Sequence, residues 1–326
     1  MASQGAFTAT VAKLISRRRA LRTLAAGALL GLGVAALPSF ASAADKEPVV
    51  VASKIDGEGA LLGNILLLMF EKGGIPTVNK VQMGATKVVR EALLAGEIGI
   101  YPEYTGNGAF MLSDVGNPAW KNWEQGYERV KKLDAEKNHL VWLEPAPANN
   151  TWAIAVRNDL AEKYKLSSLK DLGPALKDGM PFKIAAGAEF VEREDALPSF
   201  EKTYSFDLNQ DQILSFPGNN TAVFLKAAAE QNSGVNAAVV YGTDGAVASL
   251  GLTVLNDPEG AQPVYAPAPV VREAVLKAYP QIPELLNPVF KTLDTKTLQE
   301  LNGEVAINGM DPKVVARDYL KAQGFL

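Results

Sequence analysis

Five aromatic residues stand where strand-like segments of the chain end, and this placement could build a binding site. They are Tyr101, Tyr104, Trp152, Tyr241 and Tyr265. Taken singly, each is more often an ordinary core or rim aromatic. As a set they indicate a ligand, because the loops at one end of a sheet are where α/β folds bind their ligands.

A cage of aromatic rings suits a quaternary ammonium group, which cannot donate a hydrogen bond and is held by ring faces. Each desolvated cation–π contact contributes roughly 2 kcal/mol, so three or four rings supply about 6–8 kcal/mol. A micromolar site needs about 8 kcal/mol after the costs of association, so a second anchor is required. Lys54 and Arg193 could pair with a carboxylate at the other end of such a ligand, although each alone is more often a surface charge.

Several motifs of enzyme and metal sites are absent. The sequence has no G-x-S-x-G, Walker or H-E-x-x-H pattern, no G-x-G-x-x-G after its first strand, and no cysteine. Its one histidine, His139, lies where a helix gives way to a strand, and we expect a surface or capping role for it. Glu192 and Glu194 could do acid–base work, but EFVERED is better interpreted as a solvated, charged helix start. We therefore expect no enzyme, cofactor or metal site.

Residues 1–43 have the composition of a secretory signal peptide. Five basic residues and no acidic one precede an apolar run at 24–37, and the small-residue site Ala41–Ala43 predicts cleavage after Ala43. An uncleaved anchor is the alternative, but this run is shorter than the roughly 20 residues that span a bilayer. The stretch SRRRALR resembles a twin-arginine export signal, with Ala20 where a bulky residue is usual, so the general secretory route stays open.

Charge argues against nucleic acid or anionic lipid as a partner. The whole chain has a formal net charge of −4, and cleavage after Ala43 leaves 27 basic against 36 acidic residues, a net charge of −9. An acidic surface repels both polyanions. We expect an exported, soluble protein in the periplasm, large enough at 326 residues for one large domain or two medium ones.

The first part of the exported chain alternates between strand and helix patterns. Strands are predicted at 48–53, 76–83 and 98–104, with helices at 58–74 and 86–97. Gly73 and Gly74 end the first helix, and Thr86 is a plausible N-cap of the second. This order is typical of βαβ units and a parallel sheet.

A second alternating region follows a proline- and asparagine-containing break near 146–150, after a long charged helix predicted at 117–138. Its expected elements are strands within 151–159 and 182–190, a helix at 167–179 with a capping box from Ser168 to Asp171, a helix at 221–234, a strand, turn and helix over 235–251, and a mostly helical end. The sequence therefore predicts two α/β halves with a ligand crevice between them.

Several segments together resemble the OsmF/YehZ-type osmoprotectant-binding proteins. They are ASKIDGEGALLGNILL, GATKVVREALLAGEIGIYPEYTGNGAF, APANNTWAIAVR, AEFVEREDALPSFEK, GVNAAVVYGTDGAVASLGL and PVYAPAPVVRE. The likeness covers nearly the whole exported chain in the same order. It implies a type II periplasmic binding protein with two lobes that close on a glycine betaine-like ligand. It implies a monomer without a catalytic step, serving the membrane permease and ATPase of an ABC importer.

The resemblance also implies a ligand-binding set. Lys54 and Arg193 match carboxylate partners, while Asn150 and Trp152 match a position where the wider family usually has a tyrosine. The remaining members are Tyr101, Tyr104, Thr105, Tyr241, Thr243 and Tyr265. The expected division is a signal peptide at 1–43, a first lobe from 44–148 and 256–326, and a second lobe from 149–255, with the C-terminal segment packing on the first lobe.

Two departures from the wider family bear on the ligand. That family tends to read S-K-N-F-T-E-Q where this chain has Ile55, Asp56 and Gly59, and Pro102 stands where a further aromatic can occur. Losing a hydrogen bond and a ring contact would weaken betaine binding by a few kcal/mol. Either the affinity is low or the ligand is another compound, such as an amino acid or other small zwitterion. A ligand-dependent sensor role is a further alternative.

Overall fold

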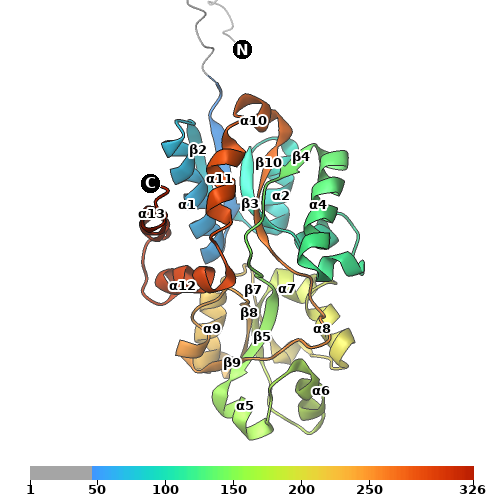
Figure 1. Cartoon of the computed structure of the whole chain (residues 1–326). Coiled ribbons are helices and arrows are strands. Elements are labelled where there is room, and N and C mark those ends of the chain that lie inside the picture. Colours follow the sequence, from blue (N-terminus) through green and yellow to red (C-terminus); the bar gives the residue numbers. More distant parts are fainter. Residues whose placement is uncertain (1–45) are drawn as a thin grey trace, which may run out of the picture. The chain divides into compact units, whose positions relative to one another are not determined.

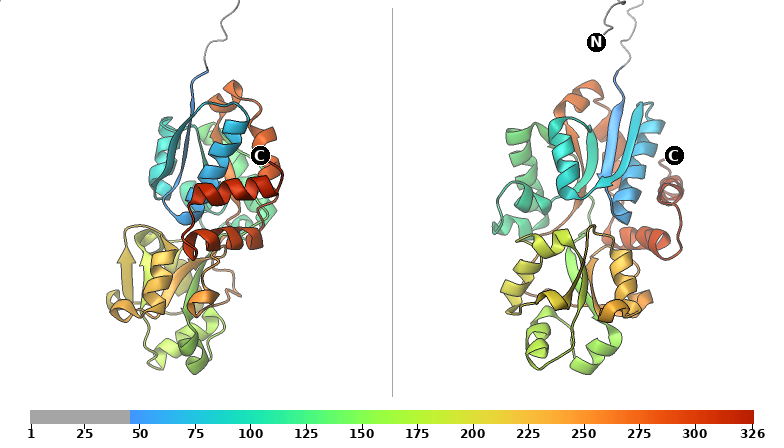
Figure 2. Two further views of the ribbon diagram at one scale, coloured as in Figure 1. Left: turned by 90° about the vertical axis from the view of Figure 1, so that its left-hand side faces the viewer. Right: turned by 180° about the vertical axis from the view of Figure 1, so that it is seen from behind.

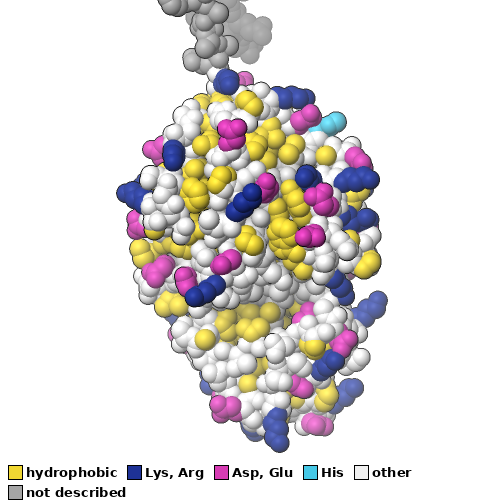
Figure 3. Space-filling model, viewed as in Figure 1, with side chains coloured by type: hydrophobic (Ala, Val, Ile, Leu, Met, Phe, Trp, Pro, Cys, Tyr) yellow, Lys and Arg dark blue, Asp and Glu magenta, His cyan; other side chains and the backbone are white. Residues whose placement is uncertain are grey.

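The computed structural model describes residues 46–326, so the predicted signal peptide lies outside the described residues. This described part holds two five-stranded sheets with helices packed on them (Figure 1). Its helices are all too short or too polar to span a bilayer. On the face shown in Figure 3, basic and acidic side chains are interspersed, without a large basic patch.

The first sheet is built mainly from the N-terminal part of the chain, in the order β2-β1-β3-β10-β4. Its strands are β1 (Val49–Lys54), β2 (Thr77–Gly84), β3 (Ile100–Tyr104), β4 (Leu140–Trp142) and β10 (Pro267–Arg272). β1 is parallel to β2 and β3, as the βαβ pattern predicts, with α1 (Gly57–Lys72) and α2 (Thr86–Ala95) as the crossovers. β10 runs antiparallel to β3 and β4, so the sheet is mixed rather than purely parallel.

The second sheet has the same mixed character, in the order β7-β6-β8-β5-β9. Its strands are β5 (Trp152–Arg157), β6 (Ile184–Gly187), β7 (Ile213–Phe216), β8 (Ala237–Tyr241) and β9 (Leu252–Val254). Its helices are α5 (Asn158–Tyr164), α6 (Leu169–Lys177), α7 (Ala188–Glu192), α8 (Leu197–Tyr204) and α9 (Thr221–Ala229). β6 is parallel to β7 and β8, whereas β5 is antiparallel to β8 and β9. The prediction of two α/β halves is confirmed, and we call each sheet with its helices a lobe.

Two connections join the lobes, one from β4 to β5 and one from β9 to β10 (Figure 1). They are hydrogen-bonded to each other, since the Asn150 N–H donates to the Tyr265 carbonyl and the Ala146 N–H to the Pro267 carbonyl. The proline-containing break near 146–150 lies in the first connection. Any movement of one lobe against the other must bend these paired segments.

The C-terminal helices lie against the first lobe. They are α10 (Glu273–Ala278), α11 (Ile282–Phe290), α12 (Thr295–Ala306) and α13 (Pro312–Ala322). The last three pack on α1, and both views of Figure 2 show the red α12 and α13 near the blue α1. Leu286, Phe290, Leu298 and Leu320 are fully buried in this layer. α12 also reaches the second lobe, where it contacts the loop after β8.

Local details correct three of the predicted helix features. Ala85, not Thr86, is the N-cap of α2, and it makes no side-chain capping bond. The long helix predicted at 117–138 is broken at Asn122, whose extended backbone ends a 3₁₀ turn and whose side chain accepts from the Gln125 N–H to start α4 (Trp123–Asn138). The helix predicted after β8 is only a 3₁₀ turn at 248–250.

Two capping predictions are confirmed. Ser168 and Asp171 form the capping box of α6. His139 is the C-cap of α4 in the left-handed region, at φ 54°, and its side chain is 80% exposed. A surface position and a cap therefore account for the single histidine.

Candidate functional site

A pocket lies between the two lobes, at the ends of β1, β3, β5 and β8. The first lobe contributes Lys54, Asp56, Thr86, Tyr104 and Asn107, and the second contributes Trp152, Glu189, Asn219 and Tyr241. Asn150 and Tyr265 come from the two connections between the lobes. The cavity volume is only about 30 Å³, so the pocket is narrow as it stands.

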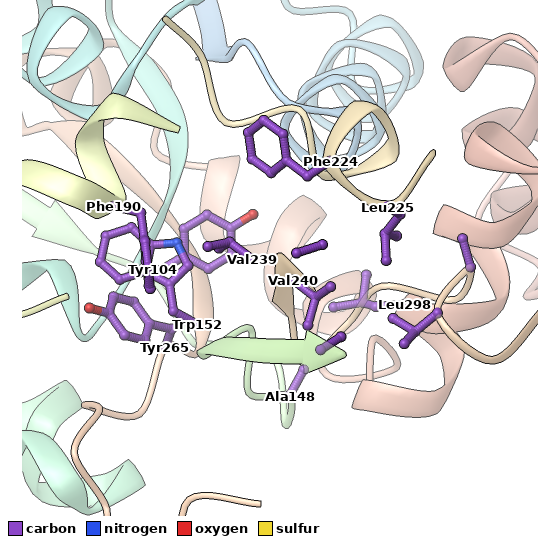
Figure 4. Close-up of a cluster of buried hydrophobic side chains, with 14 of the residues drawn as sticks. Tyr104, Ala148, Trp152, Phe190, Phe224, Leu225, Val239, Val240, Tyr265 and Leu298 are labelled. Carbon is purple, nitrogen blue, oxygen red and sulfur yellow. The ribbon is translucent and has the colours of Figure 1, made fainter. Parts of the chain in front are cut away.

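Four of the five predicted aromatic residues line this pocket. Trp152 is at the centre, stacked on Tyr241 with ring centroids 6.4 Å apart and planes at 23°, and tilted against Tyr265 at 5.7 Å. Trp152 and Tyr241 are directly opposite each other in the β5–β8 pair, which places both side chains on one face of the sheet. Figure 4 shows Tyr104, Trp152 and Tyr265 gathered together.

Phe190 is a ring that the sequence interpretation missed. It is fully buried in α7 and meets Trp152 edge-on at 5.6 Å. It lies behind Trp152 and does not line the pocket, so it supports the cage from outside. Its position three residues after β6 was the available signal, but EFVERED was interpreted there as a solvated segment.

Tyr101 lies outside the pocket, contrary to its predicted place in the cage wall. It is three residues from Tyr104 on β3, and an odd separation puts the two side chains on opposite faces of a strand. Its ring is fully buried among the apolar residues around Trp120 and Trp142, and its hydroxyl donates to Glu103 Oε2 at 2.8 Å. Tyr101 therefore belongs to the core of the first lobe.

Thr105 and Thr243 are buried next to the pocket but do not line it. The Thr105 hydroxyl donates to the Val264 carbonyl and accepts from the Ala266 N–H, which fastens the end of β3 to the second connection. The Thr243 carbonyl accepts from Asn302 on α12. Both residues hold the walls in place.

Lys54 lines the pocket but already has partners. Its Nζ is 2.5 Å from Glu103 Oε1 and 4.5 Å from the centre of the Tyr104 ring. Its side chain is 8% exposed. A ligand carboxylate would have to share this ammonium with Glu103, so the predicted anchor stays a prediction.

Arg193 corrects the interpretation of EFVERED as a solvated segment, because it and Asp195 are both buried. Its guanidinium donates to Asp195 twice, at 2.9 and 2.7 Å, and to Glu189 at 2.8 Å. It also donates to Asn107 Oδ1 at 2.9 Å, across to α3 (Asn107–Met111) of the first lobe. It covers one face of Trp152 at 4.7 Å. Arg193 thus fixes the cage tryptophan and joins the lobes, and it does not line the pocket.

Carboxylates outnumber cations around the pocket. Lys54 and Arg193 face Asp56, Glu103, Glu189 and Asp195. Burial raises the pKa of Asp56, although the Gly59 N–H and Lys54 oppose this shift. Asp56 is also the N-cap of α1. At Gly59, where the wider family tends to have a glutamine, a Cβ would lie 2.6 Å from the Lys54 carbonyl oxygen, which explains why this position is a glycine here. The surplus of negative charge favours a ligand with a positive head group.

Three buried polar atoms of residues that line the pocket have no hydrogen-bond partner within residues 46–326, namely Asn150 Oδ1, Trp152 Nε1 and Tyr265 Oη. Buried polar groups without partners are rare in folded proteins, and a bound molecule is one way to satisfy them. The hydroxyl and the indole N–H can donate to a carboxylate, and the amide oxygen can accept from a donor. In the same described part of the chain, no group of acidic or histidine side chains could hold a metal ion.

The chain is similar to substrate-binding proteins of ABC transporters. The family described as the substrate binding domain of ABC-type glycine betaine transport system, OpuAC, matches residues 47–322. The glycine betaine-binding protein YehZ of Escherichia coli K12 is 62% identical over 94% of this chain and 99% of its own length. The solved structure of apo YehZ from the same species has a TM-score of 0.64, with 64% identity over 86% of this chain and 99% of that one.

A more distant relative has a different ligand in its name. The ergothioneine transport permease/ergothioneine binding protein EgtU of Helicobacter pylori is 30% identical over 94% of this chain. This chain spans about half of that longer protein, 53% of its length.

Proposed function

Because the chain belongs to the family of substrate-binding domains of ABC-type glycine betaine transport systems, we propose that it captures glycine betaine or a related quaternary ammonium osmoprotectant for an ABC importer. In this role it performs no catalytic step, and a membrane permease is its partner. The observation that carries the proposal is the group of four rings around one pocket, contributed by both lobes and the connections between them.

The cage consists of Tyr104, Trp152, Tyr241 and Tyr265. One face of Trp152 is covered by Arg193, and Lys54 lies over the Tyr104 ring. These protein cations leave Tyr241 and Tyr265 as the rings that carry most of the contact with a ligand cation. At roughly 2 kcal/mol for each desolvated contact, two full contacts and two partial ones give about 6 kcal/mol.

The carboxylate end of the ligand would meet Lys54 and the hydroxyl of Tyr265. Lys54 already lies in the pocket wall, and the Tyr265 hydroxyl has no partner among the described residues. Sharing Lys54 with Glu103 reduces the net gain from this ion pair, because the ligand exchanges one carboxylate contact for another. This exchange supports a weaker anchor than a free lysine would give.

Capture would require the lobes to separate and close again. The walls of the pocket come from both lobes and from the connections between them, so a ligand would reach the cage while the lobes are apart. The Arg193–Asn107 hydrogen bond joins the lobes and would break on opening. Hinge closure around a ligand is the usual motion of such two-lobed proteins, and here the paired connections would bend.

A titration separates this ligand from the alternatives. The exported chain, from Ala44 onward, would be titrated with glycine betaine, choline, carnitine and amino acids, and tryptophan fluorescence would be followed in parallel. Saturation by quaternary ammonium compounds alone supports the cage. Saturation by primary amino acids alone would replace it with the zwitterion alternative.

A betaine that carries an additional hydrogen-bond donor is the second candidate. The partnerless Asn150 Oδ1 favours it, since glycine betaine has no donor to offer. Ergothioneine, named in the relative from Helicobacter pylori, combines a trimethylammonium group, a carboxylate and a ring N–H. Competition between ergothioneine and glycine betaine, repeated with Asn150→Asp, would distinguish the two.

We also propose export to the periplasm with removal of residues 1–43, and a monomeric state. N-terminal sequencing and the mass of the protein recovered from the periplasm test both. A sensor role would show as ligand-dependent capture of a receptor rather than of a permease from solubilised membranes.

A further inference from the structure

We propose that Glu58 is a positioning residue that ties the cage ring of Tyr104 to the segments about which the lobes move. The inference rests on the proposed function for its ligand readout. The tie itself is a feature of the ligand-free chain and can be tested without a ligand.

Glu58 lies in the first turn of α1, and only 6% of it is exposed. Its Oε1 accepts from the Tyr104 hydroxyl at 2.8 Å and from Asn150 Nδ2 at 2.7 Å. Its Oε2 accepts from Asn302 Nδ2 at 2.6 Å. One carboxylate thus holds a cage ring of the first sheet, the first connection between the lobes, and α12.

These contacts are unusual for a buried carboxylate because none comes from a cation. Within residues 46–326, Glu58 has no ion pair, and the nearby Lys54 pairs with Glu103 instead. Burying an unpaired carboxylate is costly, and the helix does not need it as a cap, since Asp56 already accepts from the Gly59 N–H. A role beyond holding α1 together is therefore required to explain it.

The partners of Glu58 lead to both moving parts of the site. Asn150 is two residues before Trp152, so it carries the tie to the central cage ring. Asn302 also donates to the Thr243 carbonyl at 3.0 Å, in the loop after β8. The backbone of α12 lies so close to this loop that a Cβ on Gly245 would be 2.1 Å from the Gln299 carbonyl oxygen. The carboxylate therefore lies where the first lobe, the connection and the second lobe meet.

A double-mutant cycle on glycine betaine binding tests the tie. Tyr104→Phe keeps the ring and removes its hydroxyl, whereas Glu58→Gln keeps the volume and turns an amide N–H₂ towards the donors. We expect each variant to raise the Kd about 5- to 30-fold, and the double variant to be no weaker than the weaker single one. Multiplying effects would mean that Glu58 acts independently of the Tyr104 hydroxyl and would overturn the proposal.

Asp134→Asn is the matched control. Asp134 is another fully buried carboxylate of the first lobe, but it accepts from Arg90, Asn138 and Trp142 and does not line the pocket. We expect this variant to lower the Tm and leave the Kd for glycine betaine unchanged. A Kd that rises as much as in Glu58→Gln would show that loss of any buried carboxylate disturbs the site, which would contradict a specific role.

A second readout needs no ligand. Because the chain has no cysteine, Lys87→Cys on α2 and Lys226→Cys on α9 would attach one spin label to each lobe at exposed positions. We expect Glu58→Gln to broaden the distribution of label distances in the free protein, and Asp134→Asn to leave it unchanged. If glycine betaine does not bind the unmutated chain, the proposed ligand is wrong and the distances alone decide. An unchanged distribution in Glu58→Gln would then refute the tie.

Discussion

Two buried carboxylates of the first lobe, Asp134 and Glu58, have opposite surroundings. Asp134 faces the Arg90 guanidinium and accepts from Trp142 Nε1 at 2.7 Å and Asn138 Nδ2 at 2.7 Å. Glu58 accepts only from neutral donors, and burial raises its pKa although hydrogen bonds oppose the shift. The first arrangement is balanced within the lobe. The second leaves negative charge next to a pocket, where a ligand cation can respond to it.

A similar contrast separates the aromatic residues of the first-lobe core from those of the pocket. Trp142 near Asp134 is fully buried with its N–H satisfied. The pocket rings are almost as buried, yet Tyr265 Oη has no partner within the described chain. Burial alone therefore does not distinguish core from site in this protein. Unbalanced charge and unsatisfied polar atoms do.

The largest expected effect is on ligand binding, through the central ring of the pocket. Trp152→Ala removes the ring that touches Tyr241, Tyr265 and Phe190, and we expect the Kd for glycine betaine to rise at least about 100-fold, with folding retained. Calorimetric titration measures the Kd, and circular dichroism checks the fold. Tyr164→Ala, at a half-buried tyrosine on α5, is the control and should bind as the unmutated chain does. Equal binding by Trp152→Ala would refute the cage.

The next largest effect is a loss of stability on mutation of Asp134, the buried carboxylate that pairs with Arg90. Asp134→Asn leaves the buried Arg90 without its counter-charge, and breaking a buried pair typically costs about 3 kcal/mol of stability. Denaturant unfolding should therefore show a large loss. A change of less than about 1 kcal/mol would contradict the balance assigned to this cluster.

The sequence predicted most of the aromatic residues that line the pocket, but not the buried polar residues that hold them in place. Trp152 and Tyr241 were identifiable because Trp152 begins one strand-like run and Tyr241 ends another, and antiparallel pairing of β5 with β8 brings them together. The strand predicted at 98–104 already put Tyr101 and Tyr104 on opposite faces, because they are three residues apart, but only the packing of β3 shows that Tyr104 is the one that faces the pocket. Glu58 and Asn302 are 244 residues apart, and neither residue type signals a partner at that distance. The burial of Arg193 depends on Asp195 and Asn107 together, which a charged stretch of sequence does not reveal.

A smaller effect concerns pH. Burial, opposed by hydrogen bonds from Tyr241 and Thr221 and reinforced by the charges of Glu58 and Asp56, raises the pKa of Asp244 to about 7. The folded chain therefore holds a proton that the unfolded chain has released, so this contribution is fully present below about pH 4 and is lost as the pH rises through 7. We expect the free energy of unfolding to fall by about 1–3 kcal/mol between pH 5 and pH 8. Asp244→Asn should flatten that slope, and an unchanged slope would assign it to another group.

The smallest effect tests the carboxylate anchor. Lys54→Gln should weaken glycine betaine binding about 5-fold, a modest change because Lys54 is already paired with Glu103. Choline, which has no carboxylate, should lose nothing or bind slightly better. Equal losses for both ligands would show that Lys54 supports the pocket without meeting the carboxylate.

The central claim is that the unbalanced pocket takes up a quaternary ammonium ligand. Its most direct test is isothermal titration of the exported chain with glycine betaine, with tryptophan fluorescence followed in the same samples. The account predicts saturable one-to-one binding with a fluorescence change from Trp152, and loss of both signals in Trp152→Ala. An absence of saturation with glycine betaine, choline, carnitine and ergothioneine would contradict it.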